Sequence, residues 1–176
     1  EHYWHPDPQE RRKKLMPFLW STIAKKGQVF GNRELDCRMD NANPYWFSYP
    51  GYNEIFTGYP DTAINSNSFP PNPHVTVLEF LNRQKGLQNR VAAFGAWEAF
   101  DRILNEERSG IPVISGMNPT GGKTPTATEK KLNKMLADSY KPWHEEECFD
   151  LFTHHAALEW VSQKAPGIVY CLWRNR

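Results

Sequence analysis

The second half of the chain alternates between short apolar runs and longer segments whose apolar residues recur at helical spacing. Apolar runs bounded by polar residues and glycine are typical of buried parallel strands, and helices between such strands are typical of α/β proteins. The pattern predicts strands over residues 90–95, 111–114 and 167–173, and helices over residues 75–83, 97–105, 129–137 and 145–164. We therefore predict an α/β fold in which helices flank a parallel sheet.

The first half of the chain has a less regular pattern. Residues 9–27 have helical spacing, but Pro17 falls inside this run and removes a backbone donor, so we expect two helical pieces that meet near Met16. Residues 28–31 and 35–39 are candidates for short strands. The Arg/Lys cluster of residues 11–14 is most simply explained as a solvated helix face and not as a basic binding patch.

Length and composition favour one globular domain over residues 1–176. The chain has 39% hydrophobic and 23% charged residues. Its formal net charge of +1 mixes both signs, so we expect no electrostatic binding of nucleic acid or anionic lipid. No apolar run approaches the roughly 20 residues of a membrane-spanning helix. The chain begins at Glu1 without a signal-like segment, and we expect a mature chain or an excised piece.

Two long segments rich in Pro, Gly, Asn, Ser or Thr, residues 59–74 and 115–128, predict loops. Loops of this length are usually functional or flexible. The second loop resembles a phosphate-binding loop at a glance. However, five residues instead of four separate Gly116 from Gly122, and Pro125 follows where a helix should open. We therefore interpret it as a surface loop.

Ser48 is the residue most favourably placed for chemistry. It lies two residues before Pro50, and an apolar-periodic run that ends at Gly58 follows, so the spacing predicts that Ser48 enters a short helix near free backbone N–H groups. Such a position favours a bound phosphate or sulfate, or a developing negative charge. Ser48 is then either an N-cap hydroxyl, for which serine is a preferred residue, or a nucleophile.

Other reactive side chains give weaker signals. Cys37, Cys148 and Cys171 are far apart and lack metal-ligand spacing, so we expect buried thiols, with one disulfide as the alternative. His154 and His155 are adjacent on a predicted helix and point about 100° apart, so they cannot chelate one metal ion. No histidine lies at a spacing that would indicate a hydrolase base for Ser48.

Several blocks of the sequence resemble one family. Ser48-Tyr49-Pro50 followed by Ile55-Phe56-Thr57-Gly58-Tyr59-Pro60 is similar to the nucleophile segment of the alkaline phosphatase superfamily in its nucleotide pyrophosphatase/phosphodiesterase members. The chain as a whole is closer to the alkaline phosphatase-like proteins of the sulfatase-like group. The further resembling blocks are residues 16–20, 72–79, 90–95 and 108–113, and the resemblance covers roughly residues 9–170.

This resemblance implies a partial alkaline-phosphatase-like α/β domain and a metal-dependent hydrolase, a phosphatase or phosphodiesterase, acting on small-molecule phosphate or sulfate esters. Ser48 would be the nucleophile and would bridge two metal ions, zinc or other divalent ions, that clamp the attacking and leaving oxygens. Asn53 is a candidate oxyanion contact. A periplasmic or secreted location is implied as well.

The sequence departs from the family pattern at the nucleophile segment and at both ends. Gly51 stands where diesterase members carry an asparagine, and no strand with an aspartate ligand precedes residue 9. After Tyr170 the chain lacks the expected acidic and histidine ligands. We therefore expect a fragment whose other metal ligands lie outside this chain and which is inactive when isolated. The alternative is a non-catalytic binding or scaffolding domain that retains the fold.

Overall fold

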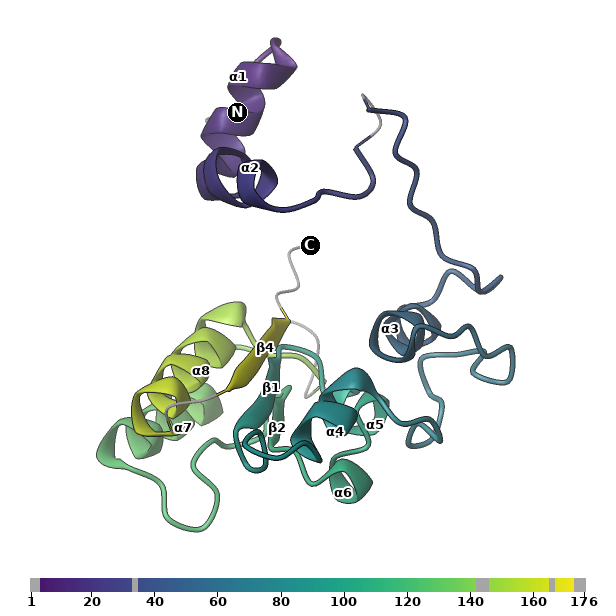
Figure 1. Cartoon of the computed structure of the whole chain (residues 1–176). Coiled ribbons are helices and arrows are strands. Elements are labelled where there is room, and N and C mark those ends of the chain that lie inside the picture. The colour runs from purple at the N-terminus through teal and green to yellow at the C-terminus, as the bar shows by residue number, and fades with distance from the viewer. Residues whose placement is uncertain (1–3, 33–34, 142–145, 165–166, 173–176) are drawn as a thin grey trace. The chain divides into compact units, whose positions relative to one another are not determined.

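The computed structural model describes residues 4–32, 35–141, 146–164 and 167–172. Contacts divide the chain into two units, Glu1–Asp40 and Asn41–Arg176, which we describe separately. Figure 1 shows the helices of the first unit and the helices and parallel strands of the second.

The first unit consists of helical segments. Helix α1 (Pro8–Leu15) begins after Asp7, whose carboxylate accepts from the Gln9 amide at 2.8 Å. It ends at Met16. Helical structure resumes at Pro17 and continues as the π-helical turn η1 (Leu19–Ile23) and α2 (Ala24–Lys26). The predicted break near Met16 is confirmed.

The two strands predicted in this unit are wrong. Residues 28–31 and 35–39 form turns and irregular chain, and they pair with no strand among the described residues. Gly31 and Asp36 have positive φ angles of 83° and 49°, which bend the backbone away from an extended course. An apolar run becomes a strand only where another strand can pair with it.

The second unit is built on a parallel sheet of three strands in the order β2-β1-β4. The strands are β1 (Val91–Gly95), β2 (Val113–Ser115) and β4 (Ile168–Leu172). Ala93 of β1 pairs with Val113 of β2, and Val91 pairs with Ile168 of β4. All three predicted strands of the second half are confirmed, with boundaries shifted by one or two residues.

Helices cover both faces of the sheet (Figure 1). The side chains of β1 alternate between the faces, and all are buried. On one face Val91 and Ala93 pack with residues of α3 (Ser48–Thr57), α4 (Val77–Asn82) and α5 (Phe100–Ile103). On the other face Ala92 and Phe94 pack against α8 (Asp150–Lys164), beside which α7 (Ala127–Asp138) lies. The predicted α/β fold with flanking helices is confirmed.

Two predicted helices are shorter than the pattern suggested. The run over residues 97–105 is helical only in α5, and a further short helix, α6 (Glu106–Ser109), follows. Helix α8 begins at Asp150, not near residue 145, which lies outside the described residues. The preceding segment is extended because Cys148 donates to the Ala96 carbonyl at 2.9 Å and Glu147 bridges Trp97 in antiparallel fashion.

Irregular chain connects the elements over residues 59–76 and 116–126. Within the described part of the chain, no helix has both the length and the apolar character needed to cross a membrane. The prediction that residues 1–176 form a single domain stays a prediction.

Gly95→Ala tests the packing between β1 and α5, and Gly51→Ala in α3 is the comparison. A Cβ added at Gly95 would lie 2.3 Å from Cδ2 of Phe100, so we expect Gly95→Ala to lower the free energy of unfolding by about 1–3 kcal/mol. A Cβ added at Gly51, within α3, meets no atom within 4 Å, and Gly51→Ala should raise that free energy by about 0.5–1 kcal/mol. Urea unfolding followed by circular dichroism measures both. Equal effects of the two substitutions would contradict this packing.

Candidate functional site

Ser48 is the first residue of helix α3. Phe47 is the N-cap, with extended backbone (φ −98°, ψ 156°), and no side chain caps the helix from that position. The interpretation of Ser48 as an N-cap is therefore wrong, because the helix begins one residue earlier than a serine cap requires. The Ser48 side chain is partly exposed, and its hydroxyl has no hydrogen-bond partner among the described residues. Gly58, with φ 69°, ends the helix as predicted.

The backbone donors in the first turn of α3 are mostly in use. The Tyr49 amide donates to Oδ1 of Asn67 at 2.9 Å, Pro50 has no amide hydrogen, and the Gly51 amide donates to the Phe47 carbonyl at 3.2 Å. Among residues 48–51, only Ser48 has an amide hydrogen without a partner in the described part of the chain. The expected group of free N–H donors is thus reduced to one.

Tyr49 fixes the start of α3 in the core. Its ring is fully buried and meets the Phe69 ring edge-on at 5.8 Å. Its hydroxyl donates to the Pro70 carbonyl at 2.8 Å and lies 3.1 Å from the Arg102 carbonyl. Burial raises the pKa of Tyr49, so the hydroxyl stays protonated and remains a donor. The backbone next to Ser48 is held firmly as a result.

The segment that leads into Ser48 is anchored by Glu54. The Glu54 carboxylate accepts from the amides of Ala42 and Asn43, and Asn43 Oδ1 accepts from the Tyr45 amide at 3.0 Å. These bonds hold Trp46 in a left-handed conformation (φ 54°), which is strained for a bulky residue, with 78% of its surface exposed.

Asn53 is buried in the interior and not at the helix surface. Its Nδ2 donates to the Tyr59 carbonyl at 2.9 Å, and its Oδ1 accepts from Nδ2 of Asn72 at 3.1 Å. Both ends of the amide therefore hold the loop of residues 59–76 onto α3. The predicted oxyanion contact stays a prediction, and a substrate oxygen would have to replace the Tyr59 carbonyl as the acceptor from Nδ2.

The same loop contains an acid–base pair that sequence reasoning missed. Nε2 of His74 lies 2.6 Å from Oδ2 of Asp61, and Oδ1 of Asp61 accepts from the Ala63 amide at 2.8 Å. The hydrogen bond from His74 lowers the pKa of Asp61, and the Ala63 amide adds to this effect. The pair lies beyond the C-terminal end of α3, whereas Ser48 begins that helix, so we do not assign His74 as a base for Ser48.

A buried carboxylate, Glu79, organises the far end of the loop. Nη2 of Arg108 lies 2.8 Å from Oε2 of Glu79, and Arg83 pairs with the same carboxylate. Arg108 also donates to the carbonyls of Asn72 at 2.7 Å and His74 at 2.6 Å. An unpaired buried charge is costly, so these bonds account for a fully buried glutamate.

The described residues do not supply a metal-ligand set. No group of three or more His, Cys, Asp or Glu side chains that could hold a metal ion occurs among them. His154 and His155 are adjacent, with ring centroids 5.5 Å apart. Cys37 and Cys148 are free thiols, and burial raises the pKa of Cys148 to about 11. The side chain of Cys171 lies outside the described residues.

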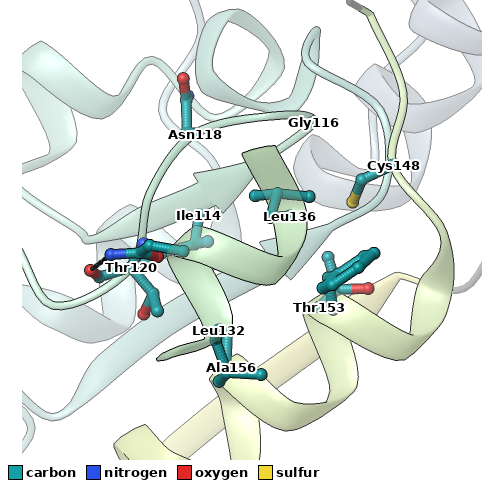
Figure 2. Close-up of a pocket in the computed structure, with 11 residues that line it drawn as sticks. Ile114, Gly116, Asn118, Thr120, Leu132, Leu136, Cys148, Thr153 and Ala156 are labelled. Atoms are coloured by element: carbon teal, nitrogen blue, oxygen red, sulfur yellow. Dashed lines mark hydrogen bonds between the residues drawn. The ribbon is translucent and has the colours of Figure 1, made fainter. Parts of the chain in front are cut away.

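Figure 2 shows a pocket at the carboxyl end of β2, between α7 and α8. Its wall is mainly apolar, and its principal polar residues, Thr120 and Asn133, bond each other reciprocally at 2.9 Å. In the neighbouring loop, Gly121 lies close to the carboxylate of Glu129. A Cβ added at Gly121 would lie 2.6 Å from Oε2 of Glu129. A carboxylate in this place disfavours a phosphate, in agreement with the interpretation of residues 116–124 as a surface loop.

Comparison of the chain with protein-family models, with curated proteins and with solved structures found no match. The resemblance to the alkaline phosphatase superfamily therefore stays a prediction.

The Asp61–His74 pair predicts a pH dependence of stability. The pKa of Asp61 in the folded protein is lower than its unfolded value of about 3.9, so Asp61 stabilises the fold above that value. This contribution is lost as the pH falls through the folded pKa. Thermal unfolding of Asp61→Asn should show a lower Tm than wild type at pH 7, and the difference should shrink below about pH 4. A difference that stays constant from pH 7 to pH 3 would exclude this role, and exposed Asp138→Asn is the control.

The hydrogen bond from the Tyr49 amide to Oδ1 of Asn67 should stabilise the start of α3, as an N-cap would, although Asn67 lies outside the helix. Asn67→Ala leaves the Tyr49 amide without its acceptor, so the free energy of unfolding should fall by about 1 kcal/mol. Asn67→Asp keeps an acceptor and should retain most of the stability. Urea unfolding compares both with Asn65→Ala, which changes an exposed asparagine of the same loop. Equal losses in Asn67→Ala and Asn65→Ala would show that the bond contributes nothing.

Proposed function

We propose that this chain belongs to a hydrolase of phosphate or sulfate esters of the alkaline phosphatase superfamily, with Ser48 as its nucleophile. The observation that supports the proposal most is the Ser48 hydroxyl. It is partly exposed, has no hydrogen-bond partner among the described residues, and begins a helix whose next residue, Tyr49, is locked in the core. A nucleophile needs this combination of access and fixed position.

In the proposed reaction Oγ of Ser48 forms a bond to the phosphorus or sulfur atom as the bond to the ester's alcohol breaks, and the alcohol leaves with the proton that the Ser48 hydroxyl gives up. Water then hydrolyses the serine ester, which releases the acid and restores the hydroxyl. The Ser48 amide is available to an ester oxygen. The resemblance also implies zinc or other divalent ions, which polarise such esters. The described residues offer Ser48 but no ligand set around it, so we assign no step to a metal. The resemblance implies that the remaining ligands lie outside this chain. A periplasmic or secreted location rests on the same resemblance.

A second candidate is a non-catalytic binding or scaffolding domain. The observation that favours it is that polar groups near Ser48 already form hydrogen bonds to other residues of the chain. The Tyr49 and Gly51 amides and both ends of the Asn53 amide bond to other residues of the chain. A degenerate site would retain these structural bonds without any catalytic need.

Hydrolysis of p-nitrophenyl phosphate tests the proposal. We expect zinc-dependent turnover by the intact protein that contains this chain, and little or none by residues 1–176 alone. Ser48→Ala should reduce turnover by at least about a thousandfold, since it removes the attacking atom. Ser68→Ala, which changes an exposed serine of the nearby loop, should leave turnover unchanged.

The outcomes separate the two candidates. About two zinc ions per intact protein together with Ser48-dependent turnover supports the hydrolase. No bound zinc and no turnover supports the binding domain. Metal-dependent turnover by residues 1–176 alone would contradict our placement of the ligands outside the chain.

A further inference from the structure

The first unit carries a strongly basic segment that the near-neutral total charge conceals. Between Pro8 and Lys26 the sequence has six basic residues and one acidic residue, Glu10. The basic residues stand at both ends of the segment, as Arg11–Lys14 and as Lys25 and Lys26. An apolar stretch that contains Leu15, Met16, Phe18 and Ile23 lies between them.

The side chains of this apolar stretch do not form a buried core. No residue of α1, η1 or α2 is buried. Phe18 is 66% exposed, Leu15 56% and Met16 52%. Burial of such side chains is favourable by roughly 1.5–3 kcal/mol each, so a surface that covers them would gain substantially.

Half of the six basic side chains are also available, whereas Arg11, which lies over the Trp4 ring at 5.5 Å, and two others have contacts. Lys13 pairs with Glu10, and Arg12 lies over the Trp20 ring at 4.7 Å. Lys14, Lys25 and Lys26 form no ion pair with a described residue, and all three are exposed. Arg12, Lys13, Lys25 and Trp20 line one shallow groove, so charge and aromatic surface occur side by side.

We propose that residues 8–26 bind the surface of an anionic lipid bilayer. Exposed lysines flanking exposed aromatic and aliphatic side chains match a surface with acidic headgroups above an apolar layer. An acidic protein would satisfy the charges, but it offers no continuous apolar layer for Phe18, Leu15 and Met16. The binding is peripheral, at the depth of the headgroups, and is independent of the function proposed for Ser48.

Vesicle flotation of the whole chain tests this proposal. The probes are vesicles of phosphatidylcholine alone and vesicles in which a quarter of the lipid is phosphatidylserine. We expect binding to the anionic vesicles, weak binding to the neutral ones, and a loss of binding as salt is raised. The triple variant Lys14→Glu, Lys25→Glu, Lys26→Glu should bind the anionic vesicles at least about tenfold more weakly.

Two further variants separate charge from apolar contact. Lys130→Glu, Lys131→Glu, Lys134→Glu makes the same change of net charge on exposed positions of α7 and should leave binding close to wild type. Phe18→Ser should weaken binding several-fold without loss of helical circular dichroism, because Phe18 is exposed.

Three results would overturn the proposal. They are equal binding to neutral and anionic vesicles, equal loss in the two triple variants, and absence of binding to either vesicle. The last result would mean that protein, from this chain or from a partner, covers the apolar stretch.

Discussion

The buried side chain of Tyr49 connects the candidate site to the rest of the second unit. Its hydroxyl reaches carbonyls from two separate parts of the chain, Pro70 in the long loop and Arg102 in α5. Loop, helix α5 and the start of α3 are therefore held by one residue that follows Ser48 directly. Beside this contact, Nη1 of Arg102 donates to the Phe69 carbonyl at 3.0 Å, so α5 is tied to the loop by a second bond.

Around this contact the loop of residues 59–76 is held by polar bonds that form one connected set. Asn53 binds Asn72, Asn72 binds Arg108 through its carbonyl, and Arg108 neutralises Glu79. Each buried polar group in this set has a partner, which is the condition under which such networks stabilise a unique structure. A long loop without helix or strand can thus be as well defined as the elements it joins.

Much of the second unit could be predicted from the sequence, because its signals are local. Residues 91–95 form an apolar run that follows Asn89 and Arg90. Thr76 caps α4 by accepting from the Glu79 amide. The short strands predicted over residues 28–31 and 35–39 failed because pairing depends on a neighbour that no local pattern reveals.

The contacts of the candidate site were harder to predict. Asn67 binds Tyr49, and Asp61 binds His74, across stretches of irregular chain that carry no periodic signal. The position of Ser48 in the first turn of α3 was predicted from Pro50 and Gly58 alone. Whether the neighbouring amides are free depends on Asn67, and the sequence could not show that.

The strand order has a consequence for the way the chain assembles. Strand β1 is central, yet its two partners lie at very different distances along the sequence, since β2 follows after α5 and α6 whereas β4 lies near the end of the chain. Closing the longer connection costs more chain entropy, so β1 and β2 pair first and β4 joins late. Until then one edge of the central strand is open, and during synthesis or refolding this edge is the place where another chain can pair wrongly.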